Sequence, residues 1–378
     1  MTDLARDPVF GEVARRLSPR CLGVIRATSG DERDDIVRLA LCTAGITAET
    51  FEYYEWKEAD GRDARLTVVP ASRGRAELLY SRGRLESDGL FFPFTAGEAL
   101  MEAHLNLERD SGPTRIMGIV NVTPDSFSDG GDHLDPSRAV EHALAQIAAG
   151  ADLIDVGGES TRPRSEPVTV EEELRRVVPV ITALAKRTRV PISIDTMKSA
   201  VARAALDAGA TIVNDVSAGL ADPAMFAVVA SRGAGYVAMH MQGDPRTMQT
   251  APHYEDVAAE VTDFLRERCF RALEAGVDRT KLWIDPGIGF GKTLEHNLEL
   301  LRRLRELRSL GLPILLGVSR KSFITKITGA ETPPEQRIGG TAAAVTLGVL
   351  GGAEILRVHD VAVMREAALV ARAIGIPS

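Results

Sequence analysis

Ile116–Gly131 reads IMGIVNVTPDSFSDGG, and this stretch decides how the rest of the chain is interpreted. Its first five residues, Ile116–Val120, are mostly apolar and are typical of a strand that is buried on both faces. The polar and glycine-rich residues from Asn121 onward predict a loop over the end of that strand. Because parallel α/β proteins bind ligands at the carboxyl ends of their strands, Asn121 is a candidate ligand contact. Taken alone, the stretch also fits an ordinary connecting loop.

The same succession recurs from Thr114 to the end of the chain: a short apolar run, then polar or glycine residues, then a helical pattern. Eight such units predict a (β/α)₈ TIM barrel. We expect its strands at Ile116–Val122, Asp152–Gly157, Pro191–Thr196, Thr211–Val216, Gly235–Met241, Lys281–Pro286, Pro313–Ser319 and Glu354–Asp360. We expect its helices at Ser137–Ala149, Val170–Lys186, Ser199–Ala208, Asp222–Ser231, Tyr254–Ala275, Leu294–Ser309, Gly340–Gly348 and Val361–Ala373. A doubly wound open sheet is the alternative, although it would offer about six strands and a glycine-rich phosphate turn after the first.

Residues 1–113 lack this succession and predict a small α+β accessory domain ahead of the barrel, which we assign to residues 114–378. Cys21–Arg26 and Ala64–Val69 predict strands, and Asp31–Ala44 has the period of an amphipathic helix. The boundary is expected near Asp110–Pro113, where Ser-Gly-Pro interrupts the pattern. The region contains no recognisable catalytic constellation, so its role is not predicted.

The composition narrows the class of protein. The chain is 44% hydrophobic and 26% charged, with a net charge of −8, so it gives no general reason to expect nucleic acid as a partner. Its three cysteines have no metal-ligand spacing and fit a reducing compartment. The N-terminus does not resemble a signal peptide, and no apolar run approaches the roughly 18 residues that span a bilayer. We therefore expect a cytoplasmic protein without a membrane partner.

Acidic and amide side chains occur inside the apolar runs themselves. ISID ends at Asp195, IVND contains Asn214, and LWID ends at Asp285. Exposure at a strand end does not account for such residues, because a charge left unpaired near a core is costly. A ligand rich in N–H donors would supply the partners that these side chains need.

Two motifs suggest other chemistries and fail on spacing. Gly289–Thr293, GFGKT, resembles a phosphate-binding loop, but the residue five positions before Gly291 is Pro286 instead of glycine. Gly317–Lys321, GVSRK, resembles a nucleophile elbow, but it ends in lysine where the second glycine should be. This disfavours Ser319 as a nucleophile.

Histidine and arginine at strand ends leave two interpretations open. His240 could bind a metal, but no second His or Cys is suitably spaced, so a packed histidine is favoured. Arg357 and His359 are two residues apart on one strand and point the same way, and an arginine fork suits oxyanions such as phosphate. The alternative for Arg357 and His359 is an ion pair with Asp360 or Asp155.

Taken together, the loop and strand-end motifs resemble the dihydropteroate synthase family. The matching segments occur in the family's order from about Arg115 to the C-terminus: NVTPDSFSDGG (Asn121–Gly131), GADLIDVGGESTRP (Gly150–Pro163), PISIDT (Pro191–Thr196), IVNDVS (Ile212–Ser217), MHMQGDPRTMQ (Met239–Gln249), DPGIGFGKT (Asp285–Thr293), GVSRKSF (Gly317–Phe323) and RVHD (Arg357–Asp360). The resemblance implies a pterin-binding barrel that condenses 6-hydroxymethyl-7,8-dihydropterin diphosphate with 4-aminobenzoate, giving 7,8-dihydropteroate and pyrophosphate for folate biosynthesis. It also implies a homodimer formed through outer helices of the barrel.

The resemblance further implies roles for individual side chains. The pterin pocket would be lined by Asp195, Asn214, Asp285 and Lys321. Asn121 would hold Mg²⁺, the implied cofactor, on the diphosphate, whose oxygens would be bound by Arg357 and His359. The aminobenzoate would be enclosed by Thr161, Arg162, Phe127, Asp129, Phe290 and Ser322. The residues expected to be catalytic are Asp195, Lys321, Asn121 and Arg357.

One position departs from the family's pattern, and two other functions compete with the synthase. Arg164 follows Pro163 where the family usually has glycine, which tolerates backbone angles that arginine does not. A pterin-binding methyltransferase would share the acidic strand ends but would not need the Asn121–Gly131 loop or the SRKS motif. A non-catalytic pterin-binding protein would lack Asn121, Lys321 or Arg357, and all three are present.

Overall fold

The structure is a computed structural model that describes residues 24–28, 52–57, 63–71, 75–82, 113–123, 135–160, 167–243 and 247–375. In the first four ranges it describes the backbone alone. The chain divides into two compact units, Met1–Asp110 with Arg305–Gly311, and Ser111–Leu304 with Leu312–Ser378. The domain boundary expected near Asp110–Pro113 stays a prediction, because most of the residues around it lie outside the described ranges.

The described residues of the N-terminal unit form four antiparallel strands in the order β1-β2-β3-β4. Their bounds are Val24–Thr28, Glu52–Lys57, Asp63–Ala71 and Arg75–Arg82. β1 and β3 overlap the two strands predicted here, Cys21–Arg26 and Ala64–Val69. The helix predicted at Asp31–Ala44 lies outside the described residues.

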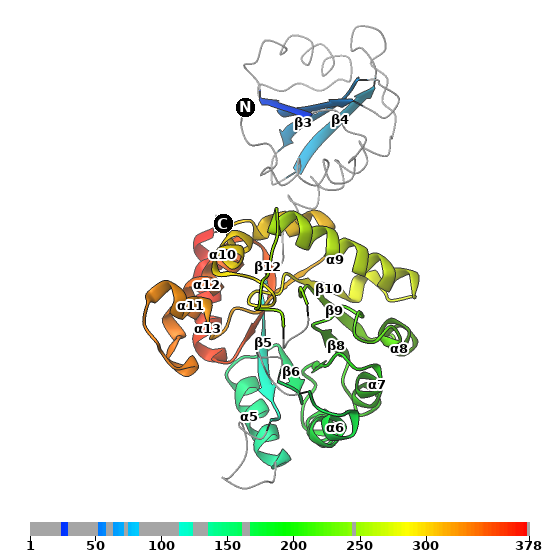
Figure 1. Ribbon diagram of the computed structural model, residues 1–378, viewed down its shortest axis with the longest axis vertical. Coiled ribbons are helices and arrows are strands. Elements are labelled where there is room, and N and C mark those ends of the chain that lie inside the picture. Colours follow the sequence, from blue (N-terminus) through cyan, green and yellow to red (C-terminus); the bar gives the residue numbers. More distant parts are fainter. Residues whose placement is uncertain are drawn as a thin grey trace. The chain divides into compact units, whose positions relative to one another are not determined.

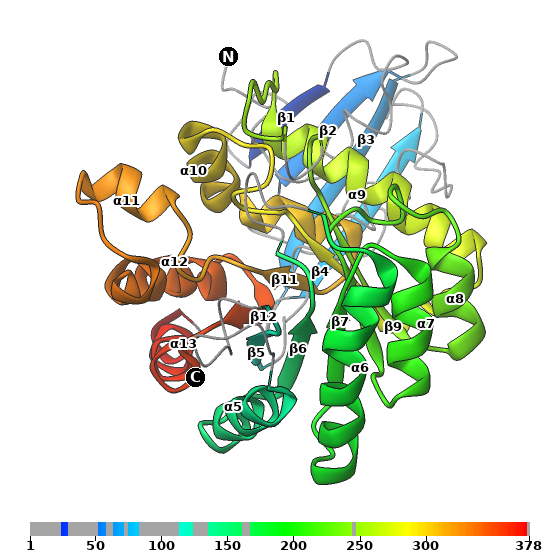
Figure 2. The same cartoon turned by 60° about the horizontal axis from the view of Figure 1, so that its bottom comes forward.

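The second unit is a barrel of parallel strands surrounded by helices (Figures 1 and 2). Its eight described strands follow the closed order β10-β11-β12-β5-β6-β7-β8-β9. β12 pairs with β5, so that Leu356 lies opposite Ile116 and the ring is complete. Closure excludes the doubly wound open sheet and confirms the TIM barrel.

The elements of the barrel follow the predicted succession. Its strands are β5 (Arg115–Asn121), β6 (Leu153–Gly157), β7 (Ile192–Asp195), β8 (Ile212–Asp215), β9 (Gly235–Met239), β10 (Leu282–Asp285), β11 (Ile314–Leu316) and β12 (Ala353–Val358). Its helices are α5 (Pro136–Ala148), α6 (Val170–Arg187), α7 (Ser199–Asp207), α8 (Met225–Arg232), α9 (Val257–Glu274), α10 (Leu294–Arg302), α11 (Phe323–Thr328), α12 (Ile338–Leu350) and α13 (Val361–Gly375). Short 3₁₀ helices lie at η2 (Arg279–Lys281), η3 (Leu304–Leu310) and η4 (Pro334–Gln336).

Two helical segments differ from the sequence prediction. The single helix expected over Leu294–Ser309 ends at Arg302, and the chain continues as the 3₁₀ helix η3. No sequence period predicts α11, because six residues contain too few turns to show one. This short helix follows the SRKS motif directly, so the extra element lies close to the candidate site.

α6 illustrates how the sequence sets the limits of a helix. Thr169 is its N-cap, and the Thr169 hydroxyl accepts a hydrogen bond from the Glu172 amide at 3.2 Å. Lys186 and Arg187 occupy its last turn, where the negative end of the helix dipole stabilises positive charge. The buried face of α6 is formed by Glu173, Val177, Val180, Ile181 and Leu184, and Glu173 is the one acidic residue on it.

An apolar cluster forms the core of the barrel. It comprises Met117, Leu153, Ile212, Val237, Leu315 and Ile355, with Trp283 packed against them. A Cβ on Gly235 would lie 2.4 Å from a ring atom of Trp283, so only glycine leaves room for the indole there. With the interior filled by these side chains, the polar groups at the carboxyl ends of the strands are left to form a site.

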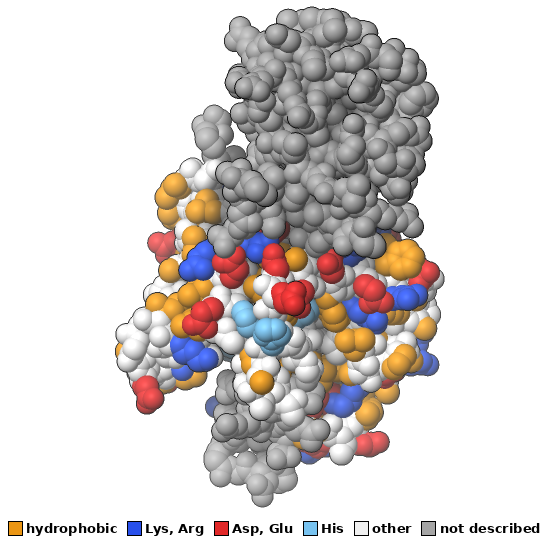
Figure 3. Space-filling view, turned by 45° about the horizontal axis from the view of Figure 1, so that its top comes forward, with side chains coloured by type: hydrophobic (Ala, Val, Ile, Leu, Met, Phe, Trp, Pro, Cys, Tyr) orange, Lys and Arg blue, Asp and Glu red, His pale blue; other side chains and the backbone are white. Residues whose placement is uncertain are grey.

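The surface of the described barrel is mixed in character. Acidic and basic side chains alternate over the face in Figure 3, with separate apolar residues between them. Within the described ranges, no helix is both long enough and apolar enough to cross a membrane.

Candidate active site

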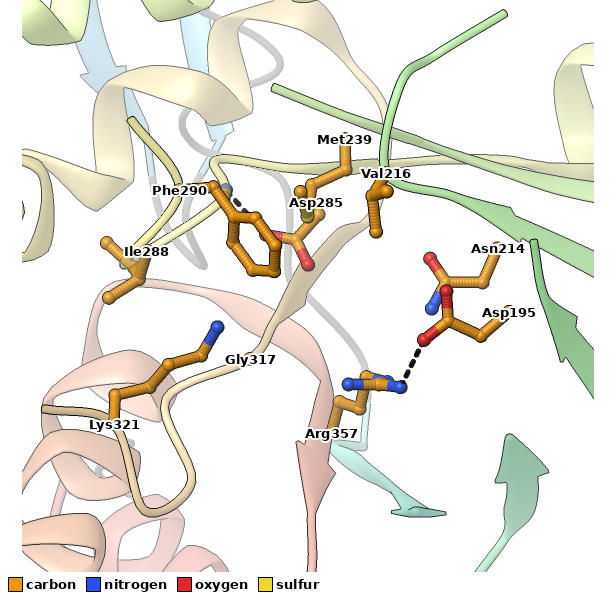
Figure 4. Close-up of a pocket in the computed structure, with 11 residues that line it drawn as sticks. Asp195, Asn214, Val216, Met239, Asp285, Ile288, Phe290, Gly317, Lys321 and Arg357 are labelled. Atoms are coloured by element: carbon orange, nitrogen blue, oxygen red, sulfur yellow. Dashed lines mark hydrogen bonds and ion pairs between the residues drawn. The ribbon is translucent and has the colours of Figure 1, made fainter. Parts of the chain in front are cut away.

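A pocket lies at the carboxyl ends of the barrel strands (Figure 4). It holds about 320 Å³ of empty space, part of which is open to solvent. Its lining residues are Asp195, Asn214, Val216, Met239, Asp285, Gly287, Ile288, Phe290, Gly317, Lys321 and Arg357. Six residues that the sequence singled out therefore meet in one pocket: Asp195, Asn214, Asp285, Phe290, Lys321 and Arg357.

Two neighbouring strands place an acid and an amide next to each other at one side of this pocket. Asp195 ends β7 and is paired in register with Asn214 on β8, so the two side chains stand next to each other. Figure 4 shows Lys321 and Arg357 entering the pocket across from Asn214. A flat ligand between them would meet hydrogen-bond acceptors at one edge and donors at another.

Arg357 is held between two carboxylates. Its Nε donates to Asp155 Oδ2 and its Nη2 donates to Asp195 Oδ2, each at 2.6 Å. Burial opposes the charged guanidinium, but the two carboxylates outweigh it and raise the pKa of Arg357 above its ordinary value. Of the ion pairs left open by the sequence, that with Asp155 is present, whereas Asp360 pairs with Arg320 at 2.6 Å.

The Asp195 carboxyl has an unusual pKa. Burial raises the pKa of Asp195 to about 7, with Asp155 adding to the rise and Arg357 opposing it. A group with this pKa changes its charge near neutrality, which is typical of residues that take part in chemistry. The side chain remains partly accessible from the pocket, at 10% exposure, so a ligand can reach it.

Asp285 and Lys321 line the pocket together with Phe290. Asp285 Oδ1 accepts from the Gly287 amide at 2.7 Å, while Oδ2 faces Gly317, another lining residue. Burial raises the pKa of Asp285. Burial lowers the pKa of Lys321 to about 8, against the attraction of Asp285. The Lys321 ammonium lies 4.1 Å from the centre of the Phe290 ring, a cation–π contact that fixes both side chains.

The lysine of the GFGKT segment is buried within its own loop, so it is not placed to bind phosphate. Lys292 is 1% exposed, and its ammonium contacts the carbonyls of Gly287 and Phe290 at 3.0 and 2.9 Å and His240 Nδ1 at 2.8 Å. Burial lowers the pKa of Lys292 to about 7. The Lys292 ammonium therefore makes hydrogen bonds within the loop, and these bonds stabilise the loop that holds Phe290 at the pocket.

His240 is a packed histidine, as the sequence favoured. Its ring lies edge-on to Phe264 at 4.8 Å between centres, and burial lowers the pKa of His240 to about 2, with the positive charge of Lys292 adding to the effect. Among the described residues, no group of three or more His, Cys, Asp or Glu side chains is arranged to hold a metal ion.

Asn121, His359 and Ser322 are described but do not line the pocket. A Cβ on Gly157 would lie 3.8 Å from Asn121 Oδ1 and 3.7 Å from Asp195 Oδ2, so these oxygens flank the same small space. His359 Nδ1 lies 3.0 Å from Ser319 Oγ, and burial lowers the pKa of His359 to about 3. Ser322 is exposed at the start of α11.

Several predicted residues lie outside the described ranges: Phe127, Asp129, Thr161, Arg162 and Arg164. Two expectations therefore stay predictions. One is the assignment of Phe127, Asp129, Thr161 and Arg162 to the aminobenzoate, and the other is the effect of Arg164 on the backbone of the second loop, residues 158–165.

Sequence reasoning did not select Asp155, Lys292 or the apolar residues of the pocket as site residues. Asp155 was recognisable as an acid inside the apolar run LIDVG, yet a sequence does not tell whether such a residue faces a ligand or another side chain. Met239 and Val216 follow the same rule as their polar neighbours, since they too stand at or just beyond strand ends. The predicted ends of the strands could therefore have identified these two residues as candidates.

Comparison with known proteins agrees with this geometry. The family described as pterin binding enzyme matches residues 117–359. Dihydropteroate synthase of Escherichia coli (strain K12) is 49% identical over 252 residues, covering 67% of this chain and 88% of that protein. The structure of Xanthomonas albilineans dihydropteroate synthase with 4-aminobenzoic acid has 51% identity and a TM-score of 0.66, covering 71% of this chain and 95% of that one. The same enzyme in complex with 7,8-dihydropteroate has 48% identity and a TM-score of 0.64, covering 71% and 97%.

Proposed function

The chain belongs to the pterin-binding enzyme family as a dihydropteroate synthase, a transferase of folate biosynthesis, and from this premise we propose which of its side chains carry out the reaction. The pocket at the strand ends is the site we assign to 6-hydroxymethyl-7,8-dihydropterin diphosphate. The second substrate, 4-aminobenzoate, would bind over it, on the solvent side.

The observation that carries the assignment is the set of unused polar atoms in the pocket. Asn214 Oδ1 is buried and has no hydrogen-bond partner among the described residues, and Asp285 keeps one oxygen free for a ligand. Leaving buried acceptors unpaired is unfavourable, so these atoms call for a ligand with N–H donors. The amino-pyrimidinone edge of a pterin has such donors, and its ring acceptors would take a hydrogen bond from Lys321.

Arg357 and His359 are assigned to the diphosphate. The guanidinium of Arg357 stays charged between its carboxylates and would neutralise phosphate oxygens as they depart. His359 is a neutral ring whose Nδ1 contacts Ser319, which leaves Nε2 as the nitrogen that can reach the diphosphate.

Asn121 is assigned to Mg²⁺. Its amide oxygen lies next to the space beside Asp195, and an oxygen ligand of this kind suits Mg²⁺, which commonly takes its other ligands from phosphates and water. The ion would supply further neutralisation of the diphosphate charge.

The reaction then follows from charge. The bond between the exocyclic carbon of the pterin and the diphosphate oxygen breaks, and the diphosphate takes the electron pair. Asp195, in its ionised form, would stabilise the cation that remains on the pterin. The amine of 4-aminobenzoate attacks that carbon, forms the new C–N bond and loses a proton. No enzyme nucleophile is required, in line with Ser319 being tied to His359 outside the pocket lining.

The aminobenzoate site is assigned to the solvent side of the pocket, next to Phe290. Phe290 lines the pocket and stacks on Lys321, so it can form one wall for an aromatic ring. Ser322 would contribute from the exposed start of α11, and Thr161, Arg162, Phe127 and Asp129 would complete the enclosure from the two loops.

The experiment that tests the assignment is a coupled pyrophosphate-release assay with both substrates. Asp195→Ala should lower kcat by about 100-fold or more, since it removes an electrostatic stabiliser of the reacting charge. Asp207→Ala is the matched control, because Asp207 forms an exposed pair with Arg232 away from the pocket. Undiminished turnover in Asp195→Ala would refute the role given to Asp195.

The two competing functions differ in readout. A pterin-binding methyltransferase would release no pyrophosphate under the same conditions, and a non-catalytic pterin-binding protein would bind the pterin diphosphate without turnover. The identity of 46–51% to dihydropteroate synthases over the whole barrel supports the synthase over both.

We also propose that the chain acts as a homodimer through α12 and α13, which lie side by side on the outside of the barrel (Figure 1). Large apolar side chains on these two helices are at least 44% exposed: Leu347, Leu350, Val363, Leu369, Val370 and Ile374. Such a gathered apolar surface is typical of an interface, and the family resemblance implies a second copy as its partner.

Sedimentation analysis tests the dimer. The wild type should sediment at twice the chain mass of 40.6 kDa at micromolar concentration, and Leu369→Glu should shift it to the monomer. Leu220→Glu is the control, because Leu220 is equally exposed, at 57%, but lies outside α12 and α13. A monomeric wild type would end this part of the proposal. The cytoplasmic location expected from the sequence stays a prediction.

A further inference from the structure

A fully buried carboxylate beneath the pocket links three strands of the barrel. Asp155 on β6 has no exposed surface and is not part of the pocket lining. Its Oδ2 accepts from Arg357 Nε on β12 at 2.6 Å and from Asn214 Nδ2 on β8 at 3.0 Å. Its Oδ1 has no hydrogen-bond partner among the described residues. Asn214 and Arg357, which line the pocket, are thus both hydrogen-bonded to Asp155, which does not line it.

This contact determines which end of the Asn214 amide faces the ligand. A carboxylate that receives a hydrogen bond from Arg357 can only accept, so the amide must turn its NH₂ group toward Asp155. The opposite end, Oδ1, is then left buried and unpaired on the ligand side. Without Asp155, the amide could turn over and offer a donor in place of an acceptor.

The same carboxylate aims the guanidinium of Arg357. With Nε on Asp155 and Nη2 on Asp195, the planar fork is held at two points from two neighbouring strands. Fixing two of its nitrogens sets the plane of the guanidinium. Nη1 is the nitrogen that takes part in neither of these two hydrogen bonds. Asp155 therefore constrains both an acceptor and a cation of the pocket.

We propose that Asp155 is a positioning residue for the pterin substrate. It holds the Asn214 amide so that the amide oxygen faces the substrate, and it fixes the orientation of the Arg357 guanidinium. This inference rests on the proposed pterin site and deepens it. Asp155 touches no substrate and acts through Asn214 and Arg357. Its charge also contributes to the raised pKa of Asp195, so its removal reaches a third group of the site.

Asp155→Leu tests the proposal, because it keeps the approximate shape of the side chain and removes the oxygen that accepts from both Arg357 and Asn214. The Asn214 amide can then turn and present its NH₂ group to the ligand, and the Arg357 guanidinium keeps only its hydrogen bond to Asp195. We expect the dissociation constant for the pterin diphosphate, measured by calorimetry with Mg²⁺, to rise by about 10- to 100-fold. The KM for 4-aminobenzoate should change by less than about threefold.

Asp155→Asn provides the rescue. Its amide oxygen can take the place of Oδ2 and accept from both Arg357 and Asn214, while its NH₂ group takes the place of Oδ1, which has no partner among the described residues. Pterin binding by Asp155→Asn should stay within about fivefold of the wild type. A loss in Asp155→Asn as large as that in Asp155→Leu would contradict the role given to this oxygen.

Ser193→Ala is the matched control. Ser193 is paired in register with Asp155 on the adjacent strand, is fully buried, and has a hydroxyl without a partner among the described residues. A general disturbance of this buried layer would affect Ser193→Ala and Asp155→Leu alike, whereas the proposal predicts a loss of pterin binding for Asp155→Leu alone. The pH profile gives an independent readout, since Asp155→Asn should move the acid limb of kcat/KM to lower pH by removing a negative neighbour of Asp195.

The outcomes separate this inference from the proposed function. If Asp285→Ala loses pterin binding but Asp155→Leu does not, the positioning role is overturned while the pocket stands. If neither variant loses binding, the pterin site itself is elsewhere. Should Asp155→Leu fail to fold, Asp155→Asn carries the test, and a folded Asp155→Asn that loses pterin binding overturns the positioning role.

Discussion

At the scale of single residues, the pocket contains an acid and a base that change charge within a narrow range of pH. Burial raises the pKa of Asp195 to about 7 and lowers the pKa of Lys321 to about 8. The proposed reaction needs Asp195 without its proton and Lys321 with its proton. Both conditions hold together only between these two values.

The first prediction is a bell-shaped profile of kcat/KM for the pterin diphosphate, with limbs near pH 7 and pH 8. Below the lower value Asp195 takes up a proton and loses the charge that stabilises the cation. Above the upper value Lys321 loses the proton that it donates to the ring. Each limb should approach a slope of about tenfold per pH unit in initial-rate measurements from pH 5.5 to 9.5.

Two variants assign the limbs. Asp195→Asn should lower the rate and remove the acid limb, because the amide does not titrate. Lys321→Arg should keep the positive charge and remove the alkaline limb, because the guanidinium stays protonated over this range. Limbs that are unchanged in both variants would show that other groups govern the profile.

Sequence reasoning reached the polar residues of the pocket because they interrupt apolar runs. Asp195, Asn214 and Asp285 could be selected as candidates because each is a polar residue at the end of a predicted strand. Their partners could not be selected in the same way. Whether Asp155 faces a ligand or supports Asn214 depends on which strands adjoin it across the ring, and that is a property of the closed barrel.

At the scale of elements, the second loop of the barrel is tied at both ends by one network. Glu159 Oε1 accepts from the Val168 amide at 3.0 Å, which joins residues on either side of that loop. Glu159 Oε2 and Glu173 Oε2 each pair with the ammonium of Lys198 at 2.5 Å. Glu173 has no exposed surface, so Lys198 is the cation that compensates a buried charge on α6.

The second prediction is that Lys198→Met lowers the free energy of unfolding by about 2 kcal/mol, since it leaves Glu173 buried without a cation. The value is below that of a fully buried pair because the Lys198 side chain is 24% exposed. Urea denaturation followed by circular dichroism measures the change. Arg175→Met is the control, since Arg175 is 64% exposed in its pair with Glu172 and its loss should leave the free energy of unfolding nearly unchanged.

If Lys198→Met and Arg175→Met lowered the free energy of unfolding equally, the burial of Glu173 without a cation would not be destabilising. The burial itself is not visible in the sequence, where Glu173 belongs to a run of three glutamates in the first turn of α6. The element was predicted correctly from its period, but the inward direction of one acidic residue depends on Lys198, which lies 25 residues away. Elements follow from local pattern, whereas contacts between elements follow from the fold.

At the scale of the whole molecule, the barrel contains every described residue of the proposed site. The family match covers residues 117–359, and relatives that this chain covers over 88–97% of their length align to only 67–71% of it. The enzymes it resembles therefore have little beyond the barrel. The eight strand–helix units predicted from repeated pattern account for this shared part, while residues 1–113 repeat no unit and gave no functional prediction.

The third prediction is that a chain beginning at Ser111, where the barrel unit starts, retains the activity. All the strands that close the ring and all the pocket side chains belong to this unit, so kcat/KM for both substrates should stay within about threefold of the full chain. The coupled pyrophosphate assay measures the rates, and circular dichroism shows whether the shortened chain folds. Asp195→Ala in the shortened chain should again lower kcat by about 100-fold or more, which ties the remaining rate to the barrel site. A folded but inactive barrel would instead assign residues 1–110 a part in the reaction, and the N-terminal sheet would become the next place to search for a substrate contact.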